Sequence, residues 1–399
     1  MFWIDSMVMT PDIEYMKEIV MDCMEQGIRI ADLTELKGKY NKRINAVIEQ
    51  LWSRYHLENP NSPKQVLAVL DRFADGRVKE CCYDEEEDKW TTNADALTRL
   101  SGYGFEFADL MLEYRECKQR MDVLNGMDVK ADEYGFVHPI VSLGKSNRIN
   151  YSKPALMNVN KDMLFDILRP RNPRNVLFSC DIKNQEPWIL INMLAIKSLK
   201  SVMATLGDDE SLYRALFFEI FERGCKNETE YNETKTAWNA LTYGCSKRSV
   251  VKMCKAVDGA RIYKKFMGIK ELKDFRDNCI KLAYAGVQEV RTYFGTKVYA
   301  DEVGKRLQRV LMDIQIQGTG SDILALLIKH CIEEFEERGL SEVITIYYTR
   351  HDEILFEVDR DFYEEAGADE VASILKNITE HKVDDWEPFR VEVKEVFKK

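Results

Sequence analysis

Three polar residues in the C-terminal part of this sequence could bind a metal ion. The stretch from Val343 to Val358 holds two runs of β-branched and aromatic residues, with His351, Asp352 and Glu353 between them. This pattern predicts a β-hairpin with the carboxylates at its turn. Adjacent acids on a rigid turn are good oxygen ligands for Mg²⁺ or Mn²⁺, although the tripeptide alone is more often a solvated turn.

A second strand-end carboxylate is needed to complete such a site, and Asp181 is the candidate. It closes the apolar run NVLFSC and is followed by Glu186 and then by Pro187, a residue typical of a helix start. We expect Asp181 and Asp352 to face each other from the ends of two strands. Two such aspartates favour a two-metal phosphoryl-transfer centre.

The composition limits the class of protein more than its function. The chain has 399 residues, of which 45% are hydrophobic and 31% charged, so it can bury a large core. The longest apolar stretch, Ile323–Ile328, is too short to span a bilayer, and Met1–Thr10 lacks the layout of a secretory signal. The ten cysteines contain no CxxC pair, which indicates reduced thiols. These features favour a cytoplasmic protein.

The formal net charge of −11 does not exclude a nucleic-acid partner, because basic residues are concentrated in two segments. The first contains Lys145, Arg148, Lys153, Lys161, Arg169, Arg171 and Arg174, and the second contains Lys247, Arg248, Lys252, Lys255, Arg261, Lys264 and Lys265.

Helices are expected to position most of the remaining residues. Apolar spacing predicts helices over residues 12–26, 35–55, 64–73, 93–101 and 105–125. Such a charge-rich helical region suits a clamp or lid, and a plain packing domain is an equal alternative. The irregular basic stretch at residues 132–161 suits contact with a phosphate backbone, or is an ordinary connector.

Two segments resemble the A-family (Pol I-like) DNA polymerases. In that family, residues in the order of Arg148, Pro154, Leu156 and Asn158 precede the first catalytic motif. CDIKNQEPWILINMLA, starting at Cys180, is similar to that motif, with a glutamate at the fifth position after the aspartate. The residues between and after these two acids differ from the usual ones.

A third segment carries a possible triphosphate site. Lys235, Asn239, Tyr243 and Lys247 are four residues apart, which predicts one face of a helix. Taken alone, a lysine stripe is more often a solvated face. The stripe resembles the family's fingers helix, in which the lysine holds the triphosphate and the tyrosine abuts the templating pair. Two positions depart from the family: its arginine is Tyr231 here, and its aromatic residue is Asn239.

Two further segments complete the family order. Arg309 and Gln317 stand where the family contacts primer and template in the minor groove, which is suited to checking pair shape. Thr319 and Ser321, which follow, are alternatively helix-cap residues for 322–337. The hairpin tripeptide HDE resembles the last catalytic motif, with His351 at a DNA-contacting position.

The resemblance implies an α+β right-hand polymerase fold with an antiparallel palm sheet, helical fingers and a helical thumb. We expect a thumb with palm entry at residues 1–140, palm at 141–205, fingers at 206–304 and palm again at 305–399. No residues remain for the family's nuclease domains, so the expected enzyme has no proofreading. A separate exonuclease or processivity factor would then be a partner.

The implied function is template-directed DNA synthesis from dNTPs at a primer 3′ end, in replication or repair, in the cytoplasm of a bacterial or phage-infected cell. Asp181, Ile182 and Asp352 are the expected ligands of two Mg²⁺ ions, or of Mn²⁺ in their place. Glu353 supports them, Lys235 offsets triphosphate charge, and Glu186 blocks a ribose 2′-hydroxyl. The alternatives are a single-subunit RNA polymerase, which Glu186 argues against, and a silent DNA-binding homologue, which the two aspartates argue against.

Overall fold

The structure is a computed structural model that divides the chain into two compact units. The first unit combines the described parts of Met1–Ile28, Pro139–Ser152 and Arg169–Lys399. The second combines Arg29–His138 and Lys153–Leu168. The residues that the structure describes are 10–73, 77–84, 88–206, 211–300, 302, 304–386 and 388–397.

The first unit is built around a four-stranded antiparallel sheet. Its order is β11 (Ile344–Arg350), β12 (Glu353–Val358), β8 (Val176–Ile182) and β13 (Val391–Phe397). Every residue of β12 is buried, and so is every residue of β8 except Asp181. Because both faces of these strands are covered, their sequences are mostly apolar and show no alternation of apolar and polar residues.

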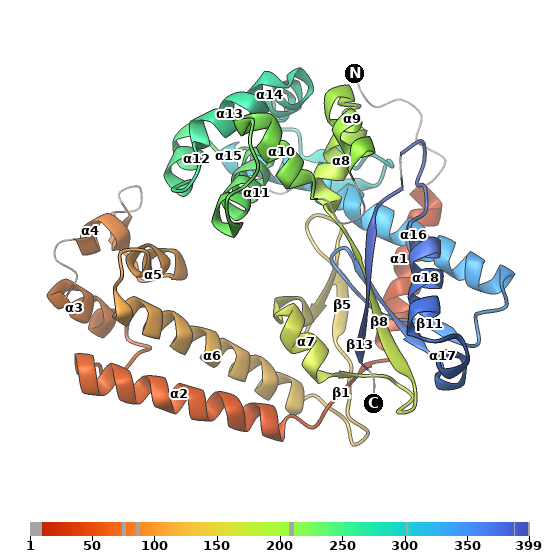
Figure 1. Cartoon of the computed structure of the whole chain (residues 1–399), viewed down its shortest axis with the longest axis horizontal. Coiled ribbons are helices and arrows are strands. Elements are labelled where there is room, and N and C mark those ends of the chain that lie inside the picture. The colour runs from red at the N-terminus through yellow and green to blue at the C-terminus, as the bar shows by residue number, and fades with distance from the viewer. Residues whose placement is uncertain are drawn as a thin grey trace. The chain divides into compact units, whose positions relative to one another are not determined.

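Helices cover this sheet along its length. Figure 1 shows α1 (Thr10–Glu25), α16 (Thr319–Glu337), α17 (Arg360–Ala366) and α18 (Ala368–Thr379) beside the strands. Thus α1 packs within the first unit, whereas most of the expected thumb with palm entry at residues 1–140 lies in the second. Within the described residues, no helix is both long and apolar enough to cross a membrane.

The chain leaves β8 through a group of helices. Figure 1 shows α10–α14 grouped beyond the end of β8, where the chain enters α8. Side chains of Ser211, Asn227, Ser246 and Asp258 accept hydrogen bonds from first-turn amides and so begin α10, α11, α12 and α13. These helices are α8 (Gln185–Met193), α9 (Lys197–Thr205), α10 (Leu212–Phe221), α11 (Glu228–Thr242), α12 (Lys247–Met253), α13 (Gly259–Gly268) and α14 (Lys270–Tyr284).

Two hairpins and a long helical segment are further elements of the first unit. The hairpins are β5 (Ile140–Leu143) with β6 (Ile149–Ser152), and β9 (Glu289–Arg291) with β10 (Lys297–Tyr299). The helical segment begins with α15 (Gly304–Asp313), continues as a five-residue π-helix, η2 (Ile314–Gly318), and runs directly into α16. No helix begins at Asp322, so the alternative that Thr319 and Ser321 are caps is wrong.

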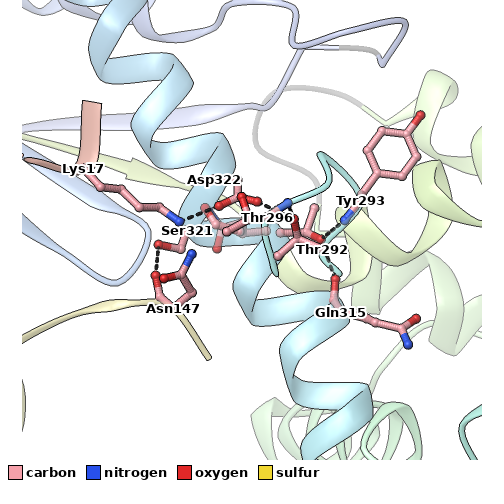
Figure 2. Close-up of polar contacts among 11 residues, drawn as sticks. Lys17, Asn147, Thr292, Tyr293, Thr296, Gln315, Ser321 and Asp322 are labelled. Carbon is pink, nitrogen blue, oxygen red and sulfur yellow. Dashed lines mark hydrogen bonds and ion pairs between the residues drawn. The ribbon is translucent and has the colours of Figure 1, made fainter. Parts of the chain in front are cut away.

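A buried ion pair joins α1 to α16 (Figure 2). The ammonium of Lys17 lies 2.5 Å from Asp322 Oδ1, and both side chains are almost fully buried. Asp322 Oδ2 accepts a hydrogen bond from Thr292 Oγ1 at 2.5 Å, and Thr292 Oγ1 accepts one from the Thr296 amide at 3.0 Å. The pair therefore holds the turn between β9 and β10 against α16.

The same region brings the β5–β6 turn onto the π-helix. Ser321 donates to the carbonyl oxygen of Asn147 at 2.8 Å (Figure 2). A Cβ on Gly318 would lie 3.0 Å from Thr292 Cγ2 and 3.1 Å from the Ser146 carbonyl oxygen. Gly318 is therefore required by the close approach of two turns to the π-helix.

The second unit contains a long helix pair. Buried residues of α2 (Thr34–Tyr55) pack against α6 (Glu106–Asp128), with the rings of Tyr55 and Phe107 5.0 Å apart. Its other elements are β1 (Ile28–Ile30), α3 (Pro63–Phe73), α4 (Arg77–Cys82), β2 (Tyr83–Asp84), β3 (Lys89–Trp90), α5 (Ala94–Ser101), β4 (Phe136–Val137), η1 (Leu156–Asn158), α7 (Lys161–Ile167) and β7 (Leu168–Arg169).

Candidate active site

Asp181 and Asp352 meet at one end of the central sheet. Asp181 is the last residue but one of β8, within the strand and not after it, and Asp352 lies in the turn between β11 and β12. The amide of Ile182 donates to the carbonyl oxygen of Asp352 at 3.0 Å. This main-chain bond fixes the turn beside the end of β8, as the strand-end interpretation predicts.

The electrostatics of the pair favour a bound cation. Burial raises the pKa of Asp352 to about 6, and the negative charge of Asp181 is the second cause of the rise. The two carboxylates therefore repel each other across a partly buried site. Burial, followed by the charges of Arg148 and Arg350, lowers the pKa of His351 to about 4, so this imidazole is neutral at pH 7 and does not offset the carboxylates.

Glu353 does not lie at the hairpin turn. It is the first residue of β12, is 3% exposed, and stands opposite Asp181 in the strand register. Its carboxylate accepts a hydrogen bond from Ser179 within the sheet. The prediction that the turn itself carries Glu353 is wrong, because strand pairing starts one residue earlier than the apolar run indicates.

The oxygen atoms at this end of the sheet suit Mg²⁺. Among the described residues, no three His, Cys, Asp or Glu side chains form a metal-binding cluster. Asp181 and Asp352 carry hard carboxylate oxygens, and the backbone carbonyl of Ile182 is a third oxygen of the same kind at the end of β8. Mg²⁺ is usually held by one or two carboxylates together with waters and substrate phosphates, so these residues fit it.

A second cluster forms next to the aspartates. Gln317 Nε2 donates to Glu186 Oε1 at 3.0 Å and to the Tyr243 hydroxyl at 3.3 Å. A guanidinium nitrogen of Arg148 lies 3.8 Å from Glu186 Oε1. Burial, and next the charge of Glu186, raises the pKa of Tyr243. The structure thus brings together four predicted residues. They are Arg148 from the turn before β6, Glu186 from α8, Tyr243 from the end of α11 and Gln317 from η2.

Arg148 connects the two clusters. Burial raises the pKa of Asp352 and also that of Asp313, a residue of α15. The positive charge of Arg148 opposes both increases. Glu186 raises both of these pKa values. Arg148 therefore lies within electrostatic range of the aspartate pair as well as of the Glu186 cluster.

Only part of the predicted lysine stripe lies on α11. Lys235 is exposed and Asn239 is half-buried on this helix, and Tyr243 is its C-terminal cap. The chain then turns at Gly244, whose φ is 86°, and Lys247 begins α12. The prediction that Lys247 shares the α11 face is wrong. It lines an open cavity of 690 Å³ with Arg261 and Lys264.

The remaining predicted DNA contacts lie on other elements. Arg309 is exposed on α15, two helical turns before Gln317. Asn158 ends η1 and belongs to the second unit. His351, with a φ of 52°, takes up the left-handed conformation that closes the turn.

Comparison with known proteins identifies the family. A model of DNA polymerase family A matches residues 30–395. The chain belongs to DNA polymerase family A. The family A match begins after α1, so the helix that carries Lys17 lies outside it.

Individual members of family A are distant in sequence. The chain is 25% identical over 362 residues to DNA polymerase I of Caldicellulosiruptor bescii, covering 84% of this chain and 40% of the relative. It is 21% identical over 328 residues to DNA polymerase I of Rhizobium leguminosarum, covering 77% and 32%. The chain therefore spans less than half the length of either relative.

The fold of family A is confirmed by a solved structure. The POL domain of Pol1 from M. smegmatis, in complex with DNA primer-template and dNTP, matches with a TM-score of 0.80 at 19% identity. The match covers 95% of this chain and 69% of that chain. The expected α+β polymerase fold with an antiparallel sheet is thus confirmed.

Sequence reasoning missed Tyr213, which the structure places beside the predicted residues of α11. Its hydroxyl donates to Asn239 Oδ1 at 2.7 Å. The segment LYRALFFEIF is apolar on most sides, which is typical of a core helix. The sequence around Tyr213 contains no local signal that would have distinguished this tyrosine from the apolar residues of the same helix.

Proposed function

We propose that this chain is a template-directed DNA polymerase that adds dNTPs to the 3′ end of a primer. The observation that carries the proposal is the Asp181–Asp352 pair at the end of the sheet, within a chain of DNA polymerase family A. Primer-template DNA and dNTPs are its partners. The cytoplasm of a bacterial or phage-infected cell is the proposed location.

Two Mg²⁺ ions, or Mn²⁺ in their place, would be held by Asp181, Asp352 and the carbonyl of Ile182. When bound, the metals lower the pKa of the primer 3′-hydroxyl and neutralise charge on the leaving pyrophosphate. The protein's own part is to hold the two carboxylates at a fixed separation through the Ile182–Asp352 main-chain bond. Glu353 supports them from within the sheet through Ser179.

The nucleotide would lie between the aspartates and α11. Lys235 would place its ammonium on the triphosphate and offset the charge that develops in the transition state. Glu186 and Tyr243, joined through Gln317, would lie beneath the sugar and leave no room for a 2′-hydroxyl. Lys247 is not included in this triphosphate site, since it lies on α12.

The DNA would be held by residues around the same site. Arg148, Arg309 and Gln317 would contact the minor groove, where acceptors are common to both orientations of a base pair. His351 would contact the primer end as a neutral imidazole, and position 158 stays a proposed DNA contact from the sequence resemblance. We propose a thumb with palm entry at residues 1–140, palm at residues 141–205 and 305–399, and fingers at residues 206–304.

We propose that these 399 residues do not proofread. The family match takes up residues 30–395, which leaves no stretch of nuclease-domain size within this chain. A primer with a mismatched 3′ end should be extended slowly or left unextended by the purified chain. Metal-dependent shortening of that primer would contradict the assignment.

Primer extension on a defined template with dNTPs or NTPs tests the main proposal. Wild-type chain should extend with dNTPs, whereas Asp181→Asn and Asp352→Asn should abolish extension and leave duplex binding intact. Each substitution removes a metal ligand without changing the basic contact surface. Extension by either variant would end the metal assignment, and equal use of NTPs would favour an RNA polymerase.

A further inference from the structure

One buried tyrosine of α10 supports three successive positions of the α11 face. Tyr213 is 2% exposed. Its ring lies edge-on to Tyr231 with centroids 6.4 Å apart, and the ammonium of Lys235 lies 5.6 Å from its ring centroid. Its hydroxyl donates to Asn239 Oδ1 at 2.7 Å. Tyr231, Lys235 and Asn239 are four residues apart, so a single ring underlies two turns of this helix face.

The hydrogen bond from Tyr213 determines how Asn239 presents its amide. Because Oδ1 accepts from the phenol, the Nδ2 group points the other way, and it has no hydrogen-bond partner within the described ranges. Nδ2 is a donor only, so it suits an acceptor oxygen of a ligand. Without the phenol, the carboxamide would be free to rotate and present either atom.

The ring of Tyr213 acts on Lys235 in a similar way. A lysine side chain has four rotatable bonds, and a cation over an aromatic face is attracted to the ring. No carboxylate in the described part of the chain lies within ion-pair distance of this ammonium. Lys235 is therefore held near α10 without its charge being neutralised, as a phosphate-binding lysine requires.

The pair of donors lies on the helix that ends at the site already described. Burial is the main cause that raises the pKa of Tyr213, but the charge of Glu186 also contributes to the rise. Asn239 lies one helical turn before Tyr243, which shares Gln317 with Glu186. The phenol of Tyr213 is thus within electrostatic range of Glu186, and its partner Asn239 lies one turn from a residue of the Glu186 cluster.

We propose that Tyr213 is a positioning residue for the incoming nucleoside triphosphate, which directs the Asn239 amide nitrogen through its hydroxyl and the Lys235 ammonium through its ring. The inference rests on the proposed function and adds a residue outside α11 to the nucleotide site. Tyr213 itself stays buried beneath the helix and acts through Asn239 and Lys235.

Tyr213→Phe tests the hydroxyl while keeping the ring in place. The measurements are the Kd of a dNTP for the complex with Mg²⁺ and a dideoxy-terminated primer on its template, and the KM and kcat of extension. We expect the Kd and the KM for dNTP to rise about 5–10-fold, which is the loss of affinity expected when one hydrogen bond is removed. The kcat, DNA affinity and Tm should change little. Tyr284→Phe, at an 86% exposed position on α14, is the matched control.

A double variant separates positioning from a general structural role. In an Asn239→Ala background, Tyr213→Phe should cause no further rise in the dNTP Kd, because its target is gone. An unchanged Kd in Tyr213→Phe, or the same rise in both backgrounds, would overturn the inference. If the wild type binds dNTP without extending a primer, the polymerase proposal fails. The dNTP Kd values of the variants then still test whether Tyr213 positions the nucleotide. If the wild type binds no dNTP, both proposals fail.

Discussion

Three carboxylates at the end of the sheet differ in what holds them. Asp352 lies in a turn next to Asp181, and their mutual repulsion leaves both suited to a cation. Glu353 is buried, and its carboxylate accepts a hydrogen bond from Ser179 of the neighbouring strand. Residues adjacent in sequence thus take different roles, because Asp352 lies in the turn whereas Glu353 begins β12.

Single substitutions of the two lysines in the predicted stripe should have different effects on nucleotide incorporation. Lys235→Ala should lower kcat/KM for dNTPs by about 100-fold or more, since a transition-state charge contact is lost. Lys247→Ala, on the neighbouring helix α12, should change it by about a factor of two at most. Single-nucleotide incorporation kinetics measure both. Similar losses in the two variants would show that α12 reaches the triphosphate.

Sugar selection is a second test of single side chains. Glu186→Ala should raise ribonucleotide use relative to dNTP by orders of magnitude, because exclusion by size is lost. Glu186→Gln keeps the size and the acceptor for Gln317, and should retain most of the discrimination. The ratio of kcat/KM for a dNTP and its ribonucleotide measures this. A Glu186→Ala variant that still rejects ribonucleotides would place the barrier elsewhere.

Among the elements, the interrupted helix from α15 to α16 organises the site. Its π-helical segment carries Gln317 toward Glu186 and Tyr243, and π segments are frequent at functional sites. Two turns pack onto this segment through Gly318, and one of them leads directly to Arg148. The element therefore sets the positions of two side chains of the Glu186 cluster.

Gly318→Ala should disturb this element. The added methyl group meets the Ser146 carbonyl oxygen at 3.1 Å, a backbone atom that cannot rotate away, so we expect a loss of about 1–3 kcal/mol in unfolding free energy. Gly268→Ala on α13 is the control, since nothing lies within 4 Å of the position that its added methyl group would take. Urea unfolding monitored by circular dichroism gives both values. Equal stability of the two variants would contradict the close packing at Gly318.

On the scale of the whole molecule, α1 contributes a charge to the core of the first unit. Lys17 is 305 residues from Asp322 in sequence, and α1 precedes the region of the family match. Removing one partner of a buried ion pair leaves an uncompensated charge, whereas replacing both is often tolerated. The N-terminal helix is therefore part of the folded polymerase unit.

Lys17→Met should destabilise the first unit by about 3–5 kcal/mol, and Lys17→Met with Asp322→Asn should recover most of that loss. The amide introduced by Asp322→Asn would keep an acceptor for Thr292 without a charge. Lys265→Met, which breaks an exposed pair with Glu219, should cost at most about 1 kcal/mol. Urea unfolding curves of Lys17→Met, of the double variant and of Lys265→Met give the three unfolding free energies. A small loss in Lys17→Met would mean that Asp322 gains water or another partner.

The sequence by itself determined the features that depend on neighbouring residues. Apolar runs predicted the strands that end near Asp181 and Asp352, helical spacing predicted α2, α6 and α11, and the order of short motifs indicated the family. These features are local, because strand and helix periodicity is written into consecutive side chains.

Tertiary structure alone decided which side chains meet. Strand register turned Glu353 toward Ser179, a turn at Gly244 removed Lys247 from the α11 face, and packing of α10 brought Tyr213 to Asn239. The Lys17–Asp322 pair likewise joins distant helices. Such contacts leave no periodic trace in the sequence, since each depends on how separate elements pack and not on the residues beside it.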